Sequence, residues 1–341
     1  MATEPMVRIA IDAMGGDYAP EEIVKGGIQA AQVADGAYEI VFVGPEETIA
    51  HEIAKHGSPL ENVRVVHAPE VIPMDEKSPA TAIRKYKQAS IVVAMGLQKQ
   101  GQVDAVIGAG NTGAAMAASL IGLGRLKGVS RPAITSPLPT QKGGITAIID
   151  AGANVDCKPA NLVEFGLMGS IYYEAVFGVK NPRVALLSNG EESSKGNEAT
   201  LEAHQLLKDA AHINFIGNVE GRDIMRGVAE VVVCDGFVGN IVLKFSESMF
   251  ATLHLAMEQQ LAKEEGHDLD VLQKAMRRIE QVFDYEEYGG APLLGINGTT
   301  IIAHGSSTAK AIRNAVKVAY RSVKNEVNRH IQEYIQELQL D

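Results

Sequence analysis

Short apolar segments alternate with helical stretches along most of the 341-residue chain, and this alternation constrains the fold more than any other feature. We predict strands over residues 7–12, 39–43, 63–67, 104–107, 145–150, 183–187, 213–216 and 231–234. Several of these are continuous apolar runs, as strands buried on both faces should be. The pattern predicts a three-layer α/β/α fold, with a mostly parallel sheet covered by helices on both faces.

Helices are predicted between these strands. One begins at Pro20, a favoured first position for proline, and a Ser78 or Thr81 cap begins another that ends near residue 99. Residues 111–126 read as a buried helix of small apolar residues, and residues 308–338 as a long amphipathic helix. Residues 246–284 break the rhythm, and we interpret them as a helical excursion within a single domain of residues 1–341.

Charge and cysteine usage narrow the partners and the compartment. The net charge of -11 argues against nucleic acid, whose binding needs a basic footprint. Two cysteines, Cys157 and Cys234, do not indicate a disulfide framework. Residues 1–8 lack the apolar segment of a signal peptide, and no apolar run reaches about 18 residues, the length that a spanning helix needs. We therefore expect a cytoplasmic protein.

The loop after the first strand is the first candidate ligand site, because ligands of open α/β sheets bind beyond the carboxyl ends of the strands. Its two glycines free backbone N–H groups and two carboxylates flank them, in the set Asp12, Gly15, Gly16 and Asp17. A tight turn with capping aspartates is the alternative interpretation.

The loop after the fourth strand matches the G-x-G-x-x-G pattern over residues 108–113. A dinucleotide site would also need an acidic residue about 20 positions on, and residues 127–144 contain none. What remains is a helix N-terminus that favours an anion such as phosphate. The candidates are Gly110, Asn111, Thr112 and Gly113, with a purely structural role as the alternative.

Later loops add polar groups in similar positions. Asn154 follows the strand at 145–150, and its amide would donate a hydrogen bond to a substrate oxygen. Lys195 and Asn197 follow the strand at 183–187, where a lysine beside glycine suits a phosphate or an oxyanion. A solvated surface loop is the alternative there. The remaining candidates are Asp235, Gly236, Gly239, Asn240 and His304.

Other chemical motifs are missing from the sequence. His51 and His56 are five residues apart, whereas the zinc motif H-E-x-x-H spaces its histidines by four. There is no G-x-S-x-G nucleophile elbow, and no Cys/His cluster suggests a metal. Nothing in the sequence marks either cysteine as an activated nucleophile.

Taken in order, these loops resemble the phosphate acyltransferase family, the acyl-[acyl-carrier-protein]–phosphate acyltransferases of bacterial phosphatidic acid synthesis. The match runs from about Arg8 to the final helix. The segments that carry it are 11–17, 109–113, 152–156, 195–198, 234–240, 288–295 and 304–307. Each segment alone is weakly specific, whereas the whole series in order is strongly specific.

The resemblance implies a fold related to isocitrate and isopropylmalate dehydrogenases and to phosphotransacetylases. It implies a homodimer without an organic cofactor or a metal. The implied reaction joins the acyl group of an acyl-carrier-protein thioester to inorganic phosphate, and the acyl phosphate feeds phospholipid synthesis.

Two segments depart from the family pattern. Residues 189–194 differ from the usual run before Lys195. Family members also contact membranes through an apolar helical tip, but residues 264–270 are acidic, so we expect only a weak peripheral contact at the inner face of the cell membrane. Five apolar residues would contact lipid, a dimer partner or the core, and we favour the last two: Met249, Phe250, Leu253, Met257 and Leu261.

Phosphate is itself a nucleophile, so the proposed reaction needs no nucleophilic side chain. Gly110, Asn111 and Thr112 would donate backbone N–H groups to phosphate, and Lys195 would neutralise charge. Asn154, Asn197 and Asn240 would orient the substrate. His304 would protonate the departing thiolate, with a structural turn histidine as the alternative.

A basic stripe on the last predicted helix is a candidate dock for the acidic carrier protein. Its members recur three or four residues apart and share a helix face: Arg313, Lys317, Arg321 and Lys324. Binding there would weaken with salt, whereas a merely solvated face is the competing interpretation. Two other functions stay open, a phosphotransacetylase that uses acyl-CoA and a non-catalytic scaffold that recruits lipid-synthesis enzymes to the membrane.

Overall fold

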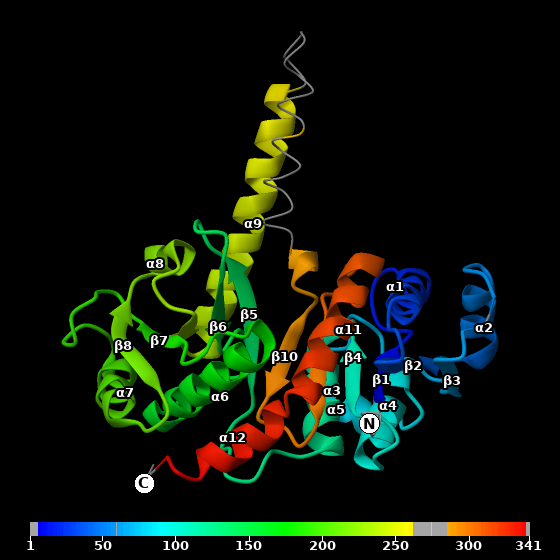
Figure 1. Ribbon diagram of the computed structural model, residues 1–341, viewed down its shortest axis with the longest axis horizontal. Coiled ribbons are helices and arrows are strands. Elements are labelled where there is room, and N and C mark those ends of the chain that lie inside the picture. Colours follow the sequence, from blue (N-terminus) through cyan, green and yellow to red (C-terminus); the bar gives the residue numbers. More distant parts are fainter. Residues whose placement is uncertain (1–5, 59, 262–273, 275–284, 339–341) are drawn as a thin grey trace.

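Eleven strands form one continuous sheet in a computed structural model that describes residues 6–58, 60–261, 274 and 285–338 (Figure 1). The strand order is β3-β2-β1-β4-β11-β10-β5-β6-β9-β7-β8. The pairings on either side of the centre are parallel, whereas β10 pairs antiparallel with both of its neighbours and β5 pairs antiparallel with β6. The predicted three-layer fold with a mostly parallel sheet is confirmed.

Apolar runs account for most of the strands. The first half of the sheet contains β1 (Val7–Asp12), β2 (Tyr38–Gly44), β3 (Val63–His67), β4 (Ala105–Gly108) and β11 (Thr299–Ile302). The other strands are β5 (Ala133–Pro139), β6 (Ile145–Ile149), β7 (Arg183–Leu187), β8 (Asn214–Val219), β9 (Val231–Val233) and β10 (Ala291–Leu294). All eight predicted strands are present, with small shifts at their ends.

Helices cover both faces of the first half. On one face lie α1 (Glu21–Gln32), α2 (Glu46–Ala54) and α11 (Ala309–Lys324), which enclose a core that includes Ile9 and Ile11. On the other lie α3 (Pro79–Lys85), α4 (Ser90–Lys99) and α5 (Thr112–Gly122), around Ala10 and Val106. The alternation of buried residues along β1 thus supplies two separate cores.

The second half repeats this layering. A large core around Phe165 joins the sheet to α6 (Pro159–Phe177), α7 (Glu198–Asp209) and α12 (Val327–Ile335). The opposite face packs against α8 (Gly221–Arg226) and the beginning of α9 (Gly236–Leu261). A short 3-10 helix, η1 (Tyr285–Glu287), precedes β10.

Three strands were missed, and all lie in the middle of the sheet. β5 contains Pro137 and Pro139, and β10 contains Pro292 and begins directly after two glycines. Proline in a run argues against a central strand because it cannot donate to the sheet ladder. β11 is only four residues long. Tertiary pairing overrides these weak local signals.

Two predicted single helices are broken. Residues 78–99 form α3 and α4, because the chain between them pairs with Glu70 through a bridge to Ala89. The closing helix breaks at Glu326, whose φ is 49°, so that α11 packs on the first-half core and α12 on the second-half core. The burial of its predicted apolar stripe is nevertheless confirmed at Ile312, Val316 and Ile331.

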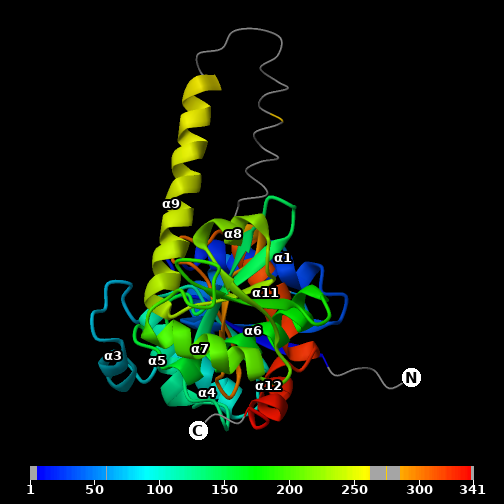
Figure 2. The same cartoon turned by 90° about the vertical axis from the view of Figure 1, so that its left-hand side faces the viewer.

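The predicted excursion at 246–284 includes part of α9, which begins at Gly236, ten residues earlier than the predicted boundary. α9 projects away from the body of the protein (Figures 1 and 2). The predicted polar turn and second helix lie outside the described residues, apart from Lys274.

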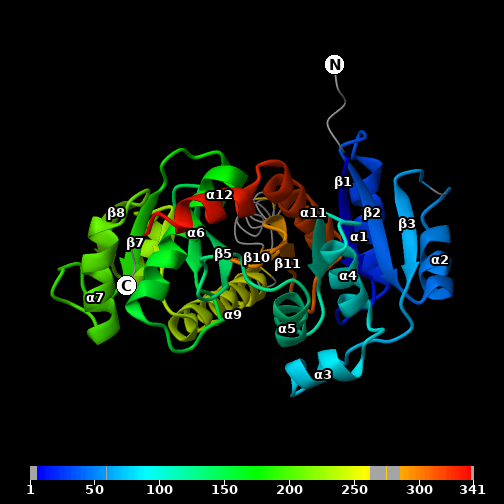
Figure 3. The same cartoon turned by 90° about the horizontal axis from the view of Figure 1, so that it is seen from below.

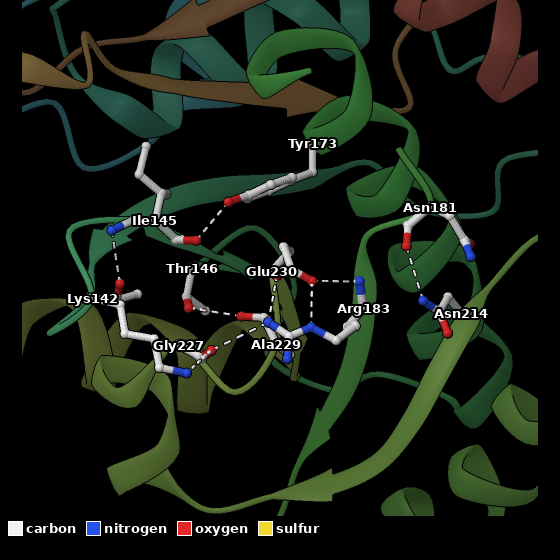
Figure 4. Close-up of polar contacts among 12 residues, drawn as sticks. Lys142, Ile145, Thr146, Tyr173, Asn181, Arg183, Asn214, Gly227, Ala229 and Glu230 are labelled. Carbon is white, nitrogen blue, oxygen red and sulfur yellow. Dashed lines mark hydrogen bonds and ion pairs between the residues drawn. The ribbon is translucent and has the colours of Figure 1, made fainter. Parts of the chain in front are cut away.

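Side chains tie the amino ends of β6, β7 and β9 together (Figure 4). Arg183 forms an ion pair of 2.6 Å with Glu230, just before β9, and its backbone N–H donates to the same carboxylate at 2.7 Å. Thr146 donates to the carbonyl oxygen of Ala229 at 2.9 Å, and Tyr173 donates to that of Ile145 at 2.7 Å. Burial alone would raise the pKa of Glu230, but the bonds and charge of Arg183 hold that pKa below its ordinary value.

The variant Glu230→Gln is expected to lower the free energy of unfolding by about 1 kcal/mol at pH 7, a typical value for a partly exposed ion pair. A carboxylate with a lowered pKa contributes stability above its unfolded pKa and loses it as the pH falls through the folded pKa. The difference between variant and wild type should therefore close below pH 4.5. Urea unfolding at pH 7 and below pH 4.5 measures this difference in stability. Glu202→Gln, on the exposed side of α7, is the control. Equal stability at pH 7 would contradict the prediction.

Candidate active site

The loops after β1, β4 and β11 meet at one edge of the sheet, because these strands are adjacent and parallel. Gly15 lies against Gly110 so closely that a methyl group on Gly15 would be 2.7 Å from the backbone nitrogen of Gly110. Gly16 has a φ of 117°, and a methyl group there would lie 3.1 Å from the carbonyl oxygen of Gly305. Two candidate glycine loops and the His304 loop are thus brought together by backbone contacts that only glycine permits.

A hydrogen bond fixes the first and third of these loops. The backbone N–H of Asp17 donates to the carbonyl oxygen of Gly305 at 2.7 Å. His304 is exposed, and its Nδ1 accepts from the backbone N–H of Ser306 at 3.2 Å. Nδ1 also lies 2.7 Å from the Ser306 hydroxyl oxygen, and which of these two atoms donates depends on the tautomer of the ring. The role of His304 as the proton donor stays a prediction.

The amino end of α5 faces this group of loops. Asn111 caps the helix, since its Oδ1 accepts from the N–H of Ala114 at 2.9 Å while its Nδ2 donates to the carbonyl oxygen of Met74 at 2.8 Å. The side chain of Asn111 is therefore structural. In the described part of the chain, the N–H groups of Thr112 and Gly113 have no acceptor, which suits an anion at this helix end.

Asp12 lies beneath these loops and is 4% exposed. Its Oδ1 accepts from the N–H of Met14 at 3.1 Å, and the Ser90 hydroxyl also bonds to the carboxylate. Burial raises the pKa of Asp12, and these hydrogen bonds oppose the rise. Asp12 thus orders the glycine loop from below. Ser90, at the start of α4, was not identified from the sequence, which gives no local signal for this contact.

A second group of loops follows β6 and β9, which are also adjacent and parallel. Its centre is Asp150, which is 0% exposed. Asp150 Oδ1 accepts from three backbone N–H groups, those of Ile134, Gly152 and Ala153. Oδ2 accepts from the N–H and the Nδ2 of Asn154, at 2.7 and 2.8 Å. Burial raises the pKa of Asp150 against these five bonds.

The amide of Asn154 is used within the protein. Its Nδ2 donates to Asp150 and to the carbonyl oxygen of Pro132, at 2.8 and 2.7 Å. Both amide hydrogens are thereby engaged, so the predicted donation from Asn154 to a substrate oxygen does not fit this geometry. Asn154 instead orders the loop. Asp150 was missed as the centre of this network, although an aspartate directly after a buried apolar strand is a signal that could have identified it.

Glycines hold the β9 loop against Asp150. The N–H of Gly236 donates to the carbonyl oxygen of Asn154 at 2.7 Å, and a methyl group on Gly239 would lie 1.9 Å from the carbonyl oxygen of Asp150. Asp235 caps α9 by accepting from the N–H of Val238 at 2.8 Å. Asn240 is half-buried beside Gly152. Gly236, Gly239 and Asp235 therefore have structural roles, whereas the role of Asn240 stays a prediction.

Lys195 lies in the exposed loop after β7. Asn197 caps α7 by accepting from the N–H of Thr200 at 2.9 Å. The loop is anchored from below by Asn218, whose Nδ2 donates to the carbonyl oxygen of Glu192 at 2.9 Å. The buried His204 bonds in turn to Asn218 Oδ1 at 2.8 Å. These two anchors were not identified from the sequence.

The three antiparallel pairings separate the loops of β1, β4 and β11 from those of β6, β7 and β9. The rule that carboxyl ends share one edge therefore holds within each half of the sheet, not across the centre. Leu243 of α9 nevertheless packs in one apolar cluster with Ala115 of α5 and with Ala151 and Ala153, beside Asn154. The two groups of loops thus border a common apolar contact between α5 and α9.

Neither cysteine is a thiolate at neutral pH. Burial, with help from the charge of Asp150, raises the pKa of Cys157 to about 11. Burial also raises the pKa of Cys234 well above its ordinary value. Both groups stay protonated, which makes them poor nucleophiles. In the described residues no three His, Cys, Asp or Glu side chains gather as metal ligands.

The basic stripe on α11 is partly available to solvent. Lys317, Arg321 and Lys324 are exposed, whereas Arg313 is half-buried and its Nε is buried without a hydrogen-bond partner. Arg321 also donates to the carbonyl oxygen of Val176 at 3.4 Å. The exposed surface therefore consists of three cations, and carrier docking stays a prediction.

Comparison with known proteins gives one consistent result. The model of the fatty acid synthesis protein family matches residues 7–330. A phosphate acyltransferase of Pelotomaculum thermopropionicum is 50% identical over 336 residues, which cover 98% of this chain and 96% of that protein. A phosphate acyltransferase of Heliobacterium modesticaldum is 53% identical over 333 residues, covering 96% and 98%.

A solved structure shares the fold. The crystal structure of a phosphotransacetylase from Streptococcus pyogenes superposes with a TM-score of 0.62 at 18% sequence identity, covering 94% of each chain. The predicted relation to phosphotransacetylases is thus confirmed at the level of fold.

Proposed function

Because this chain belongs to the phosphate acyltransferase family and is an acyltransferase, we propose that it moves a fatty acyl group from acyl-carrier protein to inorganic phosphate. The acyl phosphate would supply phosphatidic acid and phospholipid synthesis. One observation supports the phosphate site most directly. The amino end of α5 presents N–H groups of Thr112 and Gly113 beside the packed glycine loops of Gly15 and Gly110.

The reaction follows from what this site offers. A phosphate oxygen attacks the thioester carbonyl carbon, the carbon–sulfur bond breaks, and the thiolate leaves with a proton. The helix end and the N–H groups of Gly110, Asn111 and Thr112 would hold phosphate, and Lys195 would neutralise charge. Asn197 and Asn240 would orient the acyl donor, and His304 would deliver the proton.

Loss of thioester from palmitoyl-carrier protein, measured with and without phosphate, tests this function. Phosphate-dependent loss together with acyl phosphate formation is expected. Faster reaction with acetyl-CoA than with palmitoyl-carrier protein would instead favour a phosphotransacetylase. Binding of lipid-synthesis enzymes without phosphate-dependent thioester loss would favour a non-catalytic scaffold.

Lys195→Ala is expected to lower kcat/KM about a hundredfold, because one cation that stabilises a developing negative charge is worth roughly that much. The fold should persist, since the side chain is exposed and the loop is anchored by Asn218. Steady-state kinetics and thermal unfolding check both points, with Lys208→Ala on exposed α7 as the control. An unchanged kcat/KM would remove Lys195 from the site.

The exposed apolar side chains of α9 support the proposed homodimer. Five large ones recur along this helix at four-residue spacing, and their exposed fractions run from 41% to 62%: Phe237, Ile241, Phe245, Met249 and Leu253. This exposure favours a second copy of the chain over this chain's own core as the partner of Met249 and Leu253. No helix in the described ranges is long and apolar enough to cross a membrane. A cytoplasmic location with weak peripheral membrane contact completes the proposal.

A further inference from the structure

A groove of about 450 Å³ lies between α3, α4 and α5, on the face of the first half opposite α1 and α11. Figure 3 shows α3, α4 and α5 on the same side of the first half of the sheet. Sites for small organic ligands commonly have volumes of about 300–1,000 Å³ and mostly apolar walls. The groove is large enough for such a ligand, and none of the predicted site residues lines it.

The walls of the groove combine an apolar floor with two cations. The floor contains Met95 and Ala118, both nearly fully buried, together with Ile83, Val92 and Gly122. Ile121, at the rim, is 48% exposed. The other lining residues are Arg84 and Lys87, both exposed, and no acidic side chain is among the described residues that line the groove.

This composition fits one chemical class of ligand. A long alkyl chain would cover the apolar floor and the exposed Ile121, while an anionic head would pair with Arg84 and Lys87. The chain has a net charge of -11, which as a whole repels an anion, so two adjacent cations without an acid matter for binding one. A neutral lipid would leave both cations unused.

The groove also lies along the same helices as the candidate active site. Ile91 of α4 and Ala114 and Ala115 of α5 line a narrow crevice together with Gly15 and Gly110. Further along the same two helices, Val92 and Met95 of α4 and Ala118 and Ile121 of α5 line the groove. Residues 112 and 121 are about 14 Å apart along a helix that rises 1.5 Å per residue. A product released at the glycine loops has only this short distance to travel.

We propose that this groove binds a long-chain alkyl anion, the acyl phosphate product, with its phosphate on Arg84 and Lys87 and its chain between α4 and α5. The inference rests on the proposed function for the identity of the product. The binding itself does not depend on catalysis, so the two can fail separately.

The protein contains no tryptophan, which permits a direct test with single-tryptophan variants. Ile121→Trp places the only indole at the rim of the groove, and Val33→Trp places it at a site that is 65% exposed and outside the groove. Titration with hexadecyl phosphate, a stable mimic of the product, should shift the emission of Ile121→Trp to the blue and leave that of Val33→Trp unchanged. Octyl phosphate should bind at least about a hundredfold more weakly, since each buried methylene is worth about fourfold.

Charge variants test the head-group site. The double variant Arg84→Ala/Lys87→Ala, in the Ile121→Trp background, should bind hexadecyl phosphate about tenfold more weakly. Lys85→Ala is the matched control, because Lys85 stacks on Tyr86 and does not line the groove. Two further compounds test the head group: palmitate carries a carboxylate on a long alkyl chain, and hexadecanol is uncharged. Weaker binding of hexadecanol than of palmitate and hexadecyl phosphate supports the proposal.

Equal binding of hexadecanol and hexadecyl phosphate, or equal shifts in both tryptophan variants, would overturn the proposal. Tighter binding of palmitate than of hexadecyl phosphate would assign the groove to fatty acids and also overturn it. Binding as expected in a protein that shows no phosphate-dependent thioester loss would leave the groove in place and refute the proposed function instead. Phosphate-dependent turnover in a protein whose groove binds no hexadecyl phosphate would support the proposed function and refute the groove proposal.

Discussion

Gly15→Ala is expected to lower kcat/KM at least about a hundredfold, the largest loss of activity that a single methyl group should cause in this protein. The added carbon would lie 2.7 Å from the backbone nitrogen of Gly110 and 2.9 Å from Asp12 Oδ2. The Gly110 nitrogen belongs to the backbone and the Asp12 carboxylate is buried, so the two loops must separate. A displacement of about 1 Å in groups that hold a reacting anion costs roughly that factor.

The change should act on the site more than on the fold. Steady-state kinetics with palmitoyl-carrier protein measures the first, and urea unfolding measures the second. Gly96→Ala is the control, because no atom lies within 4 Å of a methyl group there and the residue is inside α4, where alanine is favoured. Wild-type activity in Gly15→Ala would show that the spacing of these loops does not matter to catalysis.

Asp150→Ala is expected to lower the free energy of unfolding by about 3–5 kcal/mol, the largest effect on stability among the changes considered. The carboxylate is 0% exposed and accepts five hydrogen bonds from four residues. Its removal leaves those donors buried without acceptors, and each unpaired buried donor costs about 1–3 kcal/mol before the loop relaxes. This loss is a large part of a domain's typical stability of about 5–15 kcal/mol.

Two further variants serve as a control and as an intermediate case. Asp209→Ala removes an exposed carboxylate from the end of α7 and should change stability by less than about 0.5 kcal/mol. Asp150→Asn keeps the shape but exchanges one acceptor oxygen for a donor, so it should fall between the two. Urea unfolding of all three proteins decides the matter. A stability for Asp150→Ala within 1 kcal/mol of wild type would mean that water replaces the carboxylate.

The glycine loops show how far local reasoning reaches into the site. Gly15, Gly16 and Gly110 were predicted because they follow apolar strands, and the structure brings them into contact. Asn197 was predicted to orient the substrate, yet its side chain caps a helix, as does that of Asn111, whose backbone N–H was the predicted phosphate donor. An asparagine before a helix satisfies either role, since the same side-chain oxygen that accepts from a backbone N–H also suits a substrate. The sequence pattern cannot separate the two.

Residues that support the loops from a distance were harder to find. Ser90 at the start of α4 reaches Asp12 at the end of β1, and His204 holds Asn218 beneath the Lys195 loop. Each contact depends on how separate elements pack together, so no residue spacing in the sequence predicts it. Asp150 is the exception, because its position after the apolar run Ile145–Ile149 marks it as a buried carboxylate that needs partners.

Periodicity and turn residues alone determined the succession of strands and helices along the chain on both sides of the central strands, because side-chain burial repeats every two residues in a strand and every 3.6 in a helix. Only the tertiary structure decided the middle of the sheet. β5 and β10 carry prolines that local preference places outside a central strand, and they become strands because neighbours on both sides supply the pairing. The break at Glu326 has the same origin: one amphipathic helix could not lie on both cores at once.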